Sequence, residues 1–116
     1  LNDLPQIQVD SEYVKKVLIN LTLNAIQSLP GGKGRIEVSS YTKDGYVNVE
    51  FLDNGMGMTE EFIRNQLFKP FISTKKKGLG IGLYQCKTIM EAHGGGIEVN
   101  SIPNRGSQFV LRFPVE

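Results

Sequence analysis

The sequence predicts an α+β domain, a two-layer sandwich in which about three helices cover one face of a mixed, mostly antiparallel sheet of about five strands. Two long stretches carry apolar residues at helical spacing, and four runs alternate apolar and polar residues as half-buried strands do. The elements follow in the order β, α, β, β, α, loop, α, β, β, which favours helices gathered on one side. We therefore expect the other face of the sheet to be partly solvated.

The composition indicates one ordinary globular domain. The 116 residues suffice for a single hydrophobic core, and 40% of them are hydrophobic and 22% charged. A net charge of +1 gives no basic footprint, so no nucleic-acid partner is expected. The single cysteine excludes an internal disulfide and a cysteine-rich zinc site, and it fits a reduced, cytoplasmic setting. No apolar run approaches the length of about 18 residues that would suggest a membrane-spanning helix.

The first half of the chain is expected to form a short strand, a helix and a β-hairpin. An extended segment, Ile7–Val9, leads to Asp10, which suits the N-cap of a helix that ends at Pro30. The apolar stripe of this helix consists of Val14, Val17, Leu18, Leu21 and Ala25. Two alternating runs, RIEVSSYT and YVNVEFLD, then flank Lys43-Asp44-Gly45, and Asp-Gly between such runs predicts a hairpin turn.

The second half is expected to hold two helices around an irregular segment, followed by two strands. Thr59 begins a short helix that reaches about Asn65. The stretch LFKPFISTKKKGLGIG contains a proline, lysines and glycines, and it predicts a loop. A second long helix is expected from Ile81 to His93, where a run of glycines ends it. The runs GIEVNSI and SQFVLRFPV predict the last two strands, joined by a turn at residues 103–106.

Two asparagines of the first helix, Asn20 and Asn24, stand four positions apart and therefore share one face. With Gln27 they flank the apolar stripe. Side-chain amide oxygens suit Mg²⁺ that keeps most of its waters and is also held by phosphates. The alternative is that these amides bond to neighbouring backbone or water, and the helix considered alone favours that alternative.

The sequence DNGMG follows a predicted strand directly. Asp53 ends the strand, and Gly55 and Gly57 allow the backbone to turn tightly and to approach a flat ligand. A carboxylate at the end of a strand can accept a hydrogen bond from an exocyclic amine such as N6 of adenine. The alternative is an ordinary Asp-Asn-Gly turn.

The sequence GLGIGL, residues 78–83, places alternating glycines just before a helix, where backbone N–H groups and the helix dipole can face an anion. It is neither a Walker loop, which needs Gly-Lys-Ser/Thr, nor the dinucleotide fingerprint G-x-G-x-x-G. The lysines before it, Lys75, Lys76 and Lys77, can attract phosphates. The alternatives are a flexible linker for the glycines and a solvated loop for the lysines.

Taken together, these motifs resemble the Bergerat-type ATP-binding domain, and specifically the catalytic domain of sensor histidine kinases. NLTLNAIQ is similar to the N box, DNGMG to the first glycine box, FKPF to the F box, GLGIGL to the second glycine box and GSQF to a shorter final glycine motif. The resemblance extends from about Asp10 to Pro114, so nearly the whole chain is expected to adopt the Bergerat fold.

The resemblance implies roles for individual residues. Asn24 resembles the magnesium ligand, and Asp53 resembles the aspartate that binds adenine, with Gly55 and Gly57 shaping the pocket beside it. Phe68 and Phe71 resemble the F-box aromatics at the base of a lid. The residues that would close over the triphosphate are Gly78, Leu79, Gly80 and Gly82. Some members carry a basic residue where Gln27 stands, so neutralisation of phosphate is expected to fall more heavily on Lys75, Lys76 and Lys77.

Asn20 decides which reaction the resemblance implies. In the ATP-hydrolysing relatives of gyrase, mismatch-repair and chaperone type, a glutamate one turn before the metal-binding asparagine activates water. Asn20 is an amide and offers no base at neutral pH. The resemblance therefore implies a kinase that binds Mg-ATP and passes the γ-phosphate to a histidine on a separate dimerisation domain. The alternatives are a serine protein kinase of the anti-sigma type and a nucleotide-sensing module without catalysis.

The histidine acceptor is expected outside this chain. The only histidine, His93, stands at a helix end and is expected to be structural, and Cys86 is expected in the core. Because the chain begins at LNDLPQIQVD without an initiator methionine, we expect residues 1–116 to be one domain excised from a longer protein. The implied partners are ATP or ADP, the acceptor domain and, indirectly, a response regulator. The domain is expected to be a cytoplasmic monomer, and its parent a homodimer whose anchoring in the plasma membrane stays open.

Overall fold

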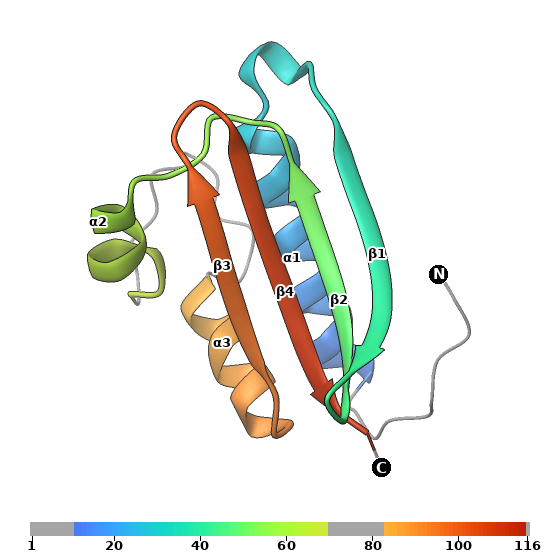
Figure 1. Cartoon of the computed structure of the whole chain (residues 1–116). Coiled ribbons are helices and arrows are strands. Elements are labelled where there is room, and N and C mark those ends of the chain that lie inside the picture. Colours follow the sequence, from blue (N-terminus) through green and yellow to red (C-terminus); the bar gives the residue numbers. More distant parts are fainter. Residues whose placement is uncertain (1–10, 70–82, 116) are drawn as a thin grey trace.

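The computed structural model describes residues 11–69 and 83–115, which form a sheet and two long helices in two layers (Figure 1). The helices are α1 Ser11–Ser28, α2 Glu60–Phe62 and α3 Leu83–Ala92, with a 3-10 turn at Pro30–Gly32 and a π-helical turn at Ile63–Leu67. The strands are β1 Ile36–Lys43, β2 Tyr46–Asp53, β3 Gly96–Ile102 and β4 Gly106–Pro114. The strand predicted at residues 7–9 and the cap predicted at Asp10 lie outside the described residues.

The sheet has the strand order β1-β2-β4-β3, and each neighbouring pair in its described part is antiparallel. Helices α1 and α3 lie on the same face of this sheet and run in opposite directions (Figure 1). The predicted α+β sandwich is therefore confirmed. Of the strands that the sequence predicts, the last four form the sheet with the bounds expected to within one residue.

The short helix is longer than the sequence predicts. Its first turn is capped by Thr59, whose Oγ1 accepts a hydrogen bond from the Phe62 N–H at 3.1 Å. The chain then continues as a π-helical turn to Leu67 instead of ending near Asn65. The apolar Leu67 side chain packs against the core, which accounts for the two extra residues.

The β1–β2 connection is the tight hairpin turn that Asp-Gly predicts. Asp44 and Gly45 both have positive φ, 53° and 80° respectively. This is the geometry of a type I′ turn, whose twist matches that of the two flanking strands. The turn sets the register of the hairpin, in which Phe51 of β2 lies opposite Val38 of β1.

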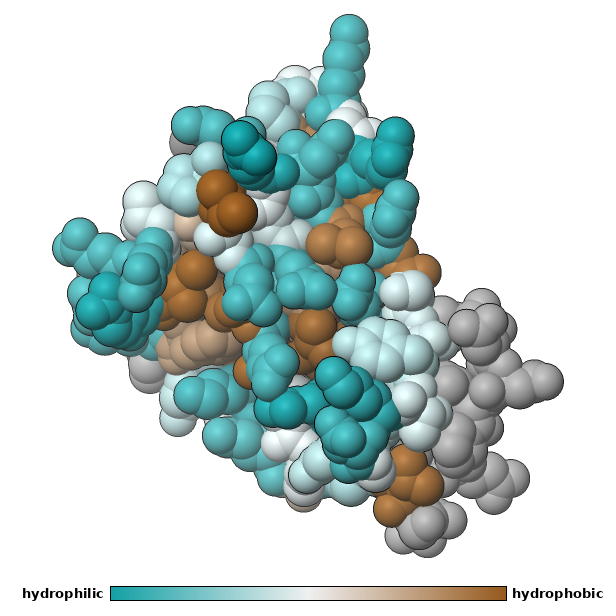
Figure 2. Space-filling view, viewed as in Figure 1, coloured by the Kyte–Doolittle hydropathy of each residue, from teal (hydrophilic) through white to brown (hydrophobic). Residues whose placement is uncertain are grey.

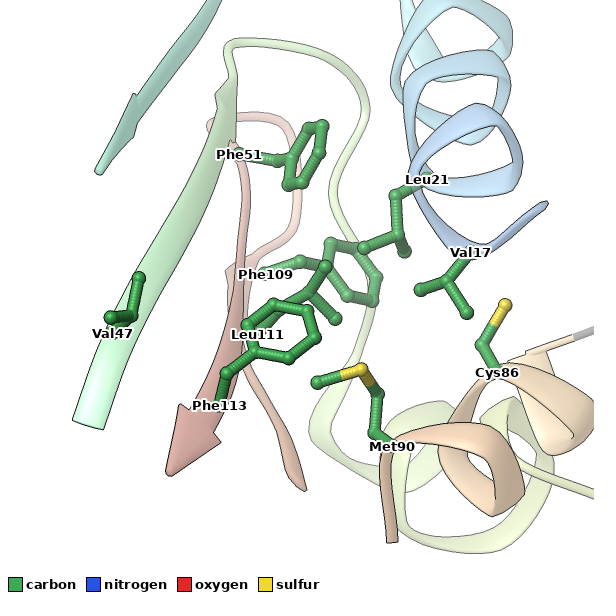
Figure 3. Close-up of a cluster of buried hydrophobic side chains, with 9 residues drawn as sticks. All are labelled: Val17, Leu21, Val47, Phe51, Cys86, Met90, Phe109, Leu111 and Phe113. Carbon is green, nitrogen blue, oxygen red and sulfur yellow. The ribbon is translucent and has the colours of Figure 1, made fainter. Parts of the chain in front are cut away.

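The core lies between the sheet and the two long helices (Figure 3). Its buried side chains come from α1, α3, β2 and β4: Val17, Leu21, Cys86, Met90, Val47, Phe51, Phe109, Leu111 and Phe113. Burial raises the pKa of the Cys86 thiol from its ordinary value of 9.0 to about 12, because the buried site disfavours the charged thiolate. The expectation that Cys86 is a small core residue is confirmed.

The opposite face of the sheet carries mostly polar side chains with apolar ones scattered among them (Figure 2), and its exposed residues agree with the predicted solvated face. Asn100 Nδ2 donates to Gln108 Oε1 at 3.2 Å, and Gln108 Nε2 donates to Glu50 Oε2 at 3.1 Å, so that one polar row crosses three strands. Arg112 forms an ion pair of 2.9 Å with Glu98 on the same face. Within residues 11–69 and 83–115, no helix is long and apolar enough to cross a membrane.

Candidate functional site

Among the described residues that the sequence singled out, Asp53, Gly55 and Gly57 lie at one end of the sheet, and Asn24 lies one turn before α1 ends there. Helix α1 and strands β2 and β3 all end there, and β4 begins there (Figure 1). The loop of residues 54–59 leaves β2 at this end and is joined by hydrogen bonds to two other segments. Met56 N–H donates to Ser28 O at 3.0 Å, and Asn104 N–H donates to Met56 O at 2.6 Å. The loop is therefore held between the end of α1 and the β3–β4 turn.

The two asparagines of α1 bond to each other. Asn24 Nδ2 donates to Asn20 Oδ1 at 2.9 Å, one helical turn apart on the flank of the apolar stripe. Asn20 is only 4% exposed, whereas Asn24 is half-buried. A buried amide needs hydrogen-bond partners, and a partner one turn away fixes the rotation of both carboxamides. Asn20 therefore orients Asn24, and the nitrogen of the Asn24 amide faces Asn20.

Asp53 is the last residue of β2 and is half-buried. Its Oδ1 accepts a hydrogen bond from the Gly55 N–H at 2.9 Å, which fixes the rotation of the carboxylate. The next side chain, Asn54, turns away and accepts a hydrogen bond from the Arg35 N–H at 2.6 Å. The Asp-Asn-Gly turn that was the alternative interpretation is thus present, and it leaves Asp53 on the helix side of the sheet.

Gly55 and Gly57 both stand where a larger residue has no room. A Cβ on Gly55 would lie 2.5 Å from Ser28 O, at the end of α1. A Cβ on Gly57, whose φ is +67°, would meet the backbone of Ile102 and lie 3.1 Å from Pro103 Cα. The two glycines therefore allow the loop to pass directly between the end of α1 and the end of β3.

Sequence reasoning missed Ser107 of β4. This residue lies directly opposite Asp53 in the β2–β4 register and is 7% exposed. Residues paired in this way point to the same face of the sheet. A signal was present, because the alternation of SQFVLRF places Ser107 on the face of Phe109 and Leu111, where a polar residue requires a reason.

Phe68 lies where the predicted lid begins, and the Lys87 ammonium of α3 stands 5.4 Å from the centroid of its ring. This contact ties the start of the lid segment to the helix that follows it. The remaining predicted lid and phosphate residues lie outside the described part of the chain: Phe71, Lys75, Lys76, Lys77, Gly78, Leu79, Gly80 and Gly82. Their roles stay predictions.

The donor set fits Mg²⁺ better than a metal that needs a protein cage. Within residues 11–69 and 83–115, no group of three or more His, Cys, Asp and Glu side chains could hold a metal ion. Mg²⁺ commonly keeps several waters and takes its other ligands from one or two side chains and from substrate phosphates. The Asn24 carboxamide, with its nitrogen directed to Asn20, would offer its oxygen to such an ion.

Comparison with known proteins agrees with this geometry. Residues 9–116 match the family model described as "Histidine kinase-, DNA gyrase B-, and HSP90-like ATPase". The chain belongs to this family. Within it, the chain is similar to sensor histidine kinases. The sensor histidine kinase ZraS of Klebsiella oxytoca is 42% identical over 113 residues, which cover 97% of this chain and 24% of ZraS. AtoS, a signal transduction histidine-protein kinase of Escherichia coli K12, is 37% identical over 98% of this chain and 19% of AtoS.

Solved structures of histidine kinases resemble this chain as well. The nucleotide-free catalytic domain of histidine kinase ThkA has a TM-score of 0.79 and 35% identity, over 93% of this chain and 70% of that chain. ThkA in complex with the response regulator protein TrrA has a TM-score of 0.79 and 31% identity, over 99% of this chain and 32% of ThkA. The chain is therefore a histidine kinase catalytic domain that binds ATP, as predicted. It spans only about a quarter of the length of ZraS.

Proposed function

We propose that this domain binds Mg-ATP at the end of the sheet where α1 and β2 end, and transfers the γ-phosphate to a histidine on a separate domain of its parent protein. The observation that carries the proposal is the buried pair of amides. Asn20, at the position where the hydrolysing relatives carry a glutamate, is 4% exposed and accepts a hydrogen bond from Asn24. An amide in this position orients its neighbour but removes no proton from water.

The described residues take distinct roles in this proposal. Asp53, fixed by Gly55 N–H, accepts a hydrogen bond from the 6-amino group of adenine, and Ser107 forms the wall opposite. Gly55 and Gly57 bring the loop backbone close enough to line this pocket. Asn24 would hold Mg²⁺, which would neutralise phosphate charge when bound. Phosphoryl transfer needs mainly this positioning and neutralisation, so the chain itself has little covalent chemistry to perform.

The roles of the lid segment follow from the family resemblance alone. Phe68 and Phe71 stand at its base, Lys75, Lys76 and Lys77 neutralise the triphosphate, and the backbone at Gly78, Leu79, Gly80 and Gly82 closes over it. The parent protein is a homodimer that carries the acceptor histidine and passes the phosphate to a response regulator. The domain works in the cytoplasm whether or not its parent is anchored in a membrane.

A transfer assay tests this function. The domain is mixed with Mg²⁺, radiolabelled ATP and a separately produced phosphoacceptor domain of the parent protein. We expect acid-labile label on the acceptor, because phosphohistidine is lost in acid, and only slow release of inorganic phosphate. Asn24→Ala should abolish the transfer, whereas Thr22→Ala, an exposed change on the same helix, should leave it intact.

Three results would contradict the proposal. Undiminished transfer by Asn24→Ala would remove the metal role of this residue. Acid-stable label on a partner protein would indicate a serine kinase instead. Rapid steady-state release of phosphate without an acceptor would indicate an ATP hydrolase.

A further inference from the structure

Ser101 is the penultimate residue of β3, and its hydroxyl forms hydrogen bonds that connect β3 with two other segments of the candidate site. It accepts a hydrogen bond from the Met58 N–H at 2.8 Å, in the loop that follows Asp53. It lies 2.8 Å from the carbonyl oxygen of Gly106 and 2.8 Å from Ser107 Oγ, both at the start of β4. A hydroxyl has one proton and two lone pairs, so these three contacts use its whole capacity.

The distances determine where the protons of both serines lie. The Gly106 carbonyl has no proton, and two oxygens at 2.8 Å attract each other only with a proton between them. The Ser101 proton must therefore point to Gly106 O. It follows that the short contact between the two hydroxyls is made by the other proton, so that Ser107 donates to Ser101.

Ser107 consequently has lone pairs, and no proton, to offer to a ligand. This side chain is buried and lies opposite Asp53 on the same face of the sheet. The carboxylate of Asp53 is also an acceptor. A ligand group that enters between these two side chains therefore meets acceptors on both sides, and it must bring its own donor hydrogens.

We propose that Ser101 is a positioning residue that makes the site selective for purines with a 6-amino group over purines with a 6-oxo group. It acts by holding the Ser107 proton away from the pocket. The inference rests on the proposed function, because it takes the base to lie against Asp53. An amino group offers hydrogens to both acceptors, whereas an oxo group places a third acceptor between them and forms no bond to either.

The test compares the affinities of ADP and inosine diphosphate by calorimetry on the 116-residue domain. The two bases differ in the group at position 6 and in the proton that the 6-oxo base carries on N1. The wild-type domain should prefer ADP. Ser101→Ala and the similarly sized Ser101→Cys release the Ser107 proton, which can then turn into the pocket and donate to an oxo group. We expect each to lower the ratio of the two affinities by about three- to tenfold, the worth of one hydrogen bond.

Two further variants separate this role from a merely structural one. Ser101→Thr keeps the hydroxyl and should keep the wild-type ratio. In a Ser107→Ala background, Ser101→Ala should change the ratio no further, because the proton whose direction it controls is gone. Equal weakening of both nucleotides by Ser101→Ala and Ser101→Cys, with an unchanged ratio, would overturn the inference.

The same titrations distinguish the failure of this inference from failure of the proposed function. ADP binding that is unaffected by Asp53→Ala would overturn the proposed function, whatever the Ser101 variants show. ADP binding that depends on Asp53, with a ratio that no Ser101 variant alters, would overturn the role of Ser101 alone.

Discussion

The two ends of the sheet are built in different ways. At one end, β1 and β2 are joined by a two-residue turn at Asp44 and Gly45, and nothing lies within 4 Å of a Cβ added to Gly45. The conformation of this turn is determined by residues that are adjacent in the sequence. At the other end, the hydrogen bond from Met58 to Ser101 joins residues 43 positions apart, and the loop passes between α1 and β3. The hairpin turn is therefore determined locally, whereas the loop at the other end, which we call the crowded end, depends on contacts between segments far apart in the sequence.

The largest expected effect compares one glycine from each end. Gly57→Ala and Gly45→Ala both place a Cβ on a residue with positive φ, 67° and 80°. We expect Gly45→Ala to lower the free energy of unfolding by about 1 kcal/mol from backbone strain alone. Gly57→Ala should lower the free energy of unfolding by about 3 kcal/mol, because its Cβ also clashes with the Ile102 backbone. Urea unfolding of both variants measures the two values, and equal losses would contradict the crowding of the site end.

The next effect compares one aspartate from each end. Asp53→Ala should weaken ADP binding by about 10- to 100-fold, because a hydrogen bond to a charged group contributes about 1.5–3 kcal/mol. Asp44→Asn removes a carboxylate from the hairpin turn and keeps a residue that tolerates positive φ. It should leave ADP binding unchanged. Calorimetric titrations that show equal affinity for wild type and Asp53→Ala would remove the adenine assignment.

A smaller effect is expected for the residue that orients Asn24. Asn20→Ala removes the oxygen that accepts from Asn24 Nδ2, and should weaken Mg-ATP binding about fivefold, close to 1 kcal/mol. Asn20→Asp keeps an acceptor at the same place and should bind more tightly than Asn20→Ala. Titration with and without Mg²⁺ is the measurement. A loss of the same size in both conditions would argue against a role at the metal.

The smallest effect concerns the core between the two ends. The folded pKa of Cys86 is raised to about 12, above the ordinary 9.0, so the folded state holds this proton more tightly than the unfolded chain does. The resulting stability is complete below pH 9 and is lost as the pH rises from 9 towards 12. Between pH 8 and 9.5 the wild type should lose about 0.8 kcal/mol more than Cys86→Ala in thermal or urea unfolding. Identical pH slopes would mean that the thiol is accessible to solvent.

The same comparison explains how much the sequence could predict. Alternation and Asp-Gly were sufficient for the hairpin, and helical spacing placed Val17, Leu21 and Cys86 in the core. Local pattern also placed Asn20 next to Asn24, but their hydrogen bond is a matter of side-chain rotation that spacing does not determine. The alternation of its strand marked Ser107 as a polar residue on the core face, but its hydrogen bond to Ser101 had no local signal, because it depends on the register between β3 and β4. The contact of Ser101 with Met58 likewise depends on a loop more than 40 residues away. The family resemblance therefore predicted which residues belong to the candidate site, but it did not predict the hydrogen bonds between them.

One measurement tests the central claim most directly, namely that the nucleotide binds at the crowded end of the sheet. ADP is titrated into the ¹⁵N-labelled domain while the backbone amide signals are followed by NMR. The signals of Gly55, Met58 and Ser107 should shift and saturate together, while those of Asp44, Gly45 and Val115 stay in place. Saturable shifts that gather at the hairpin end, with Gly55 and Ser107 unmoved, would contradict the account.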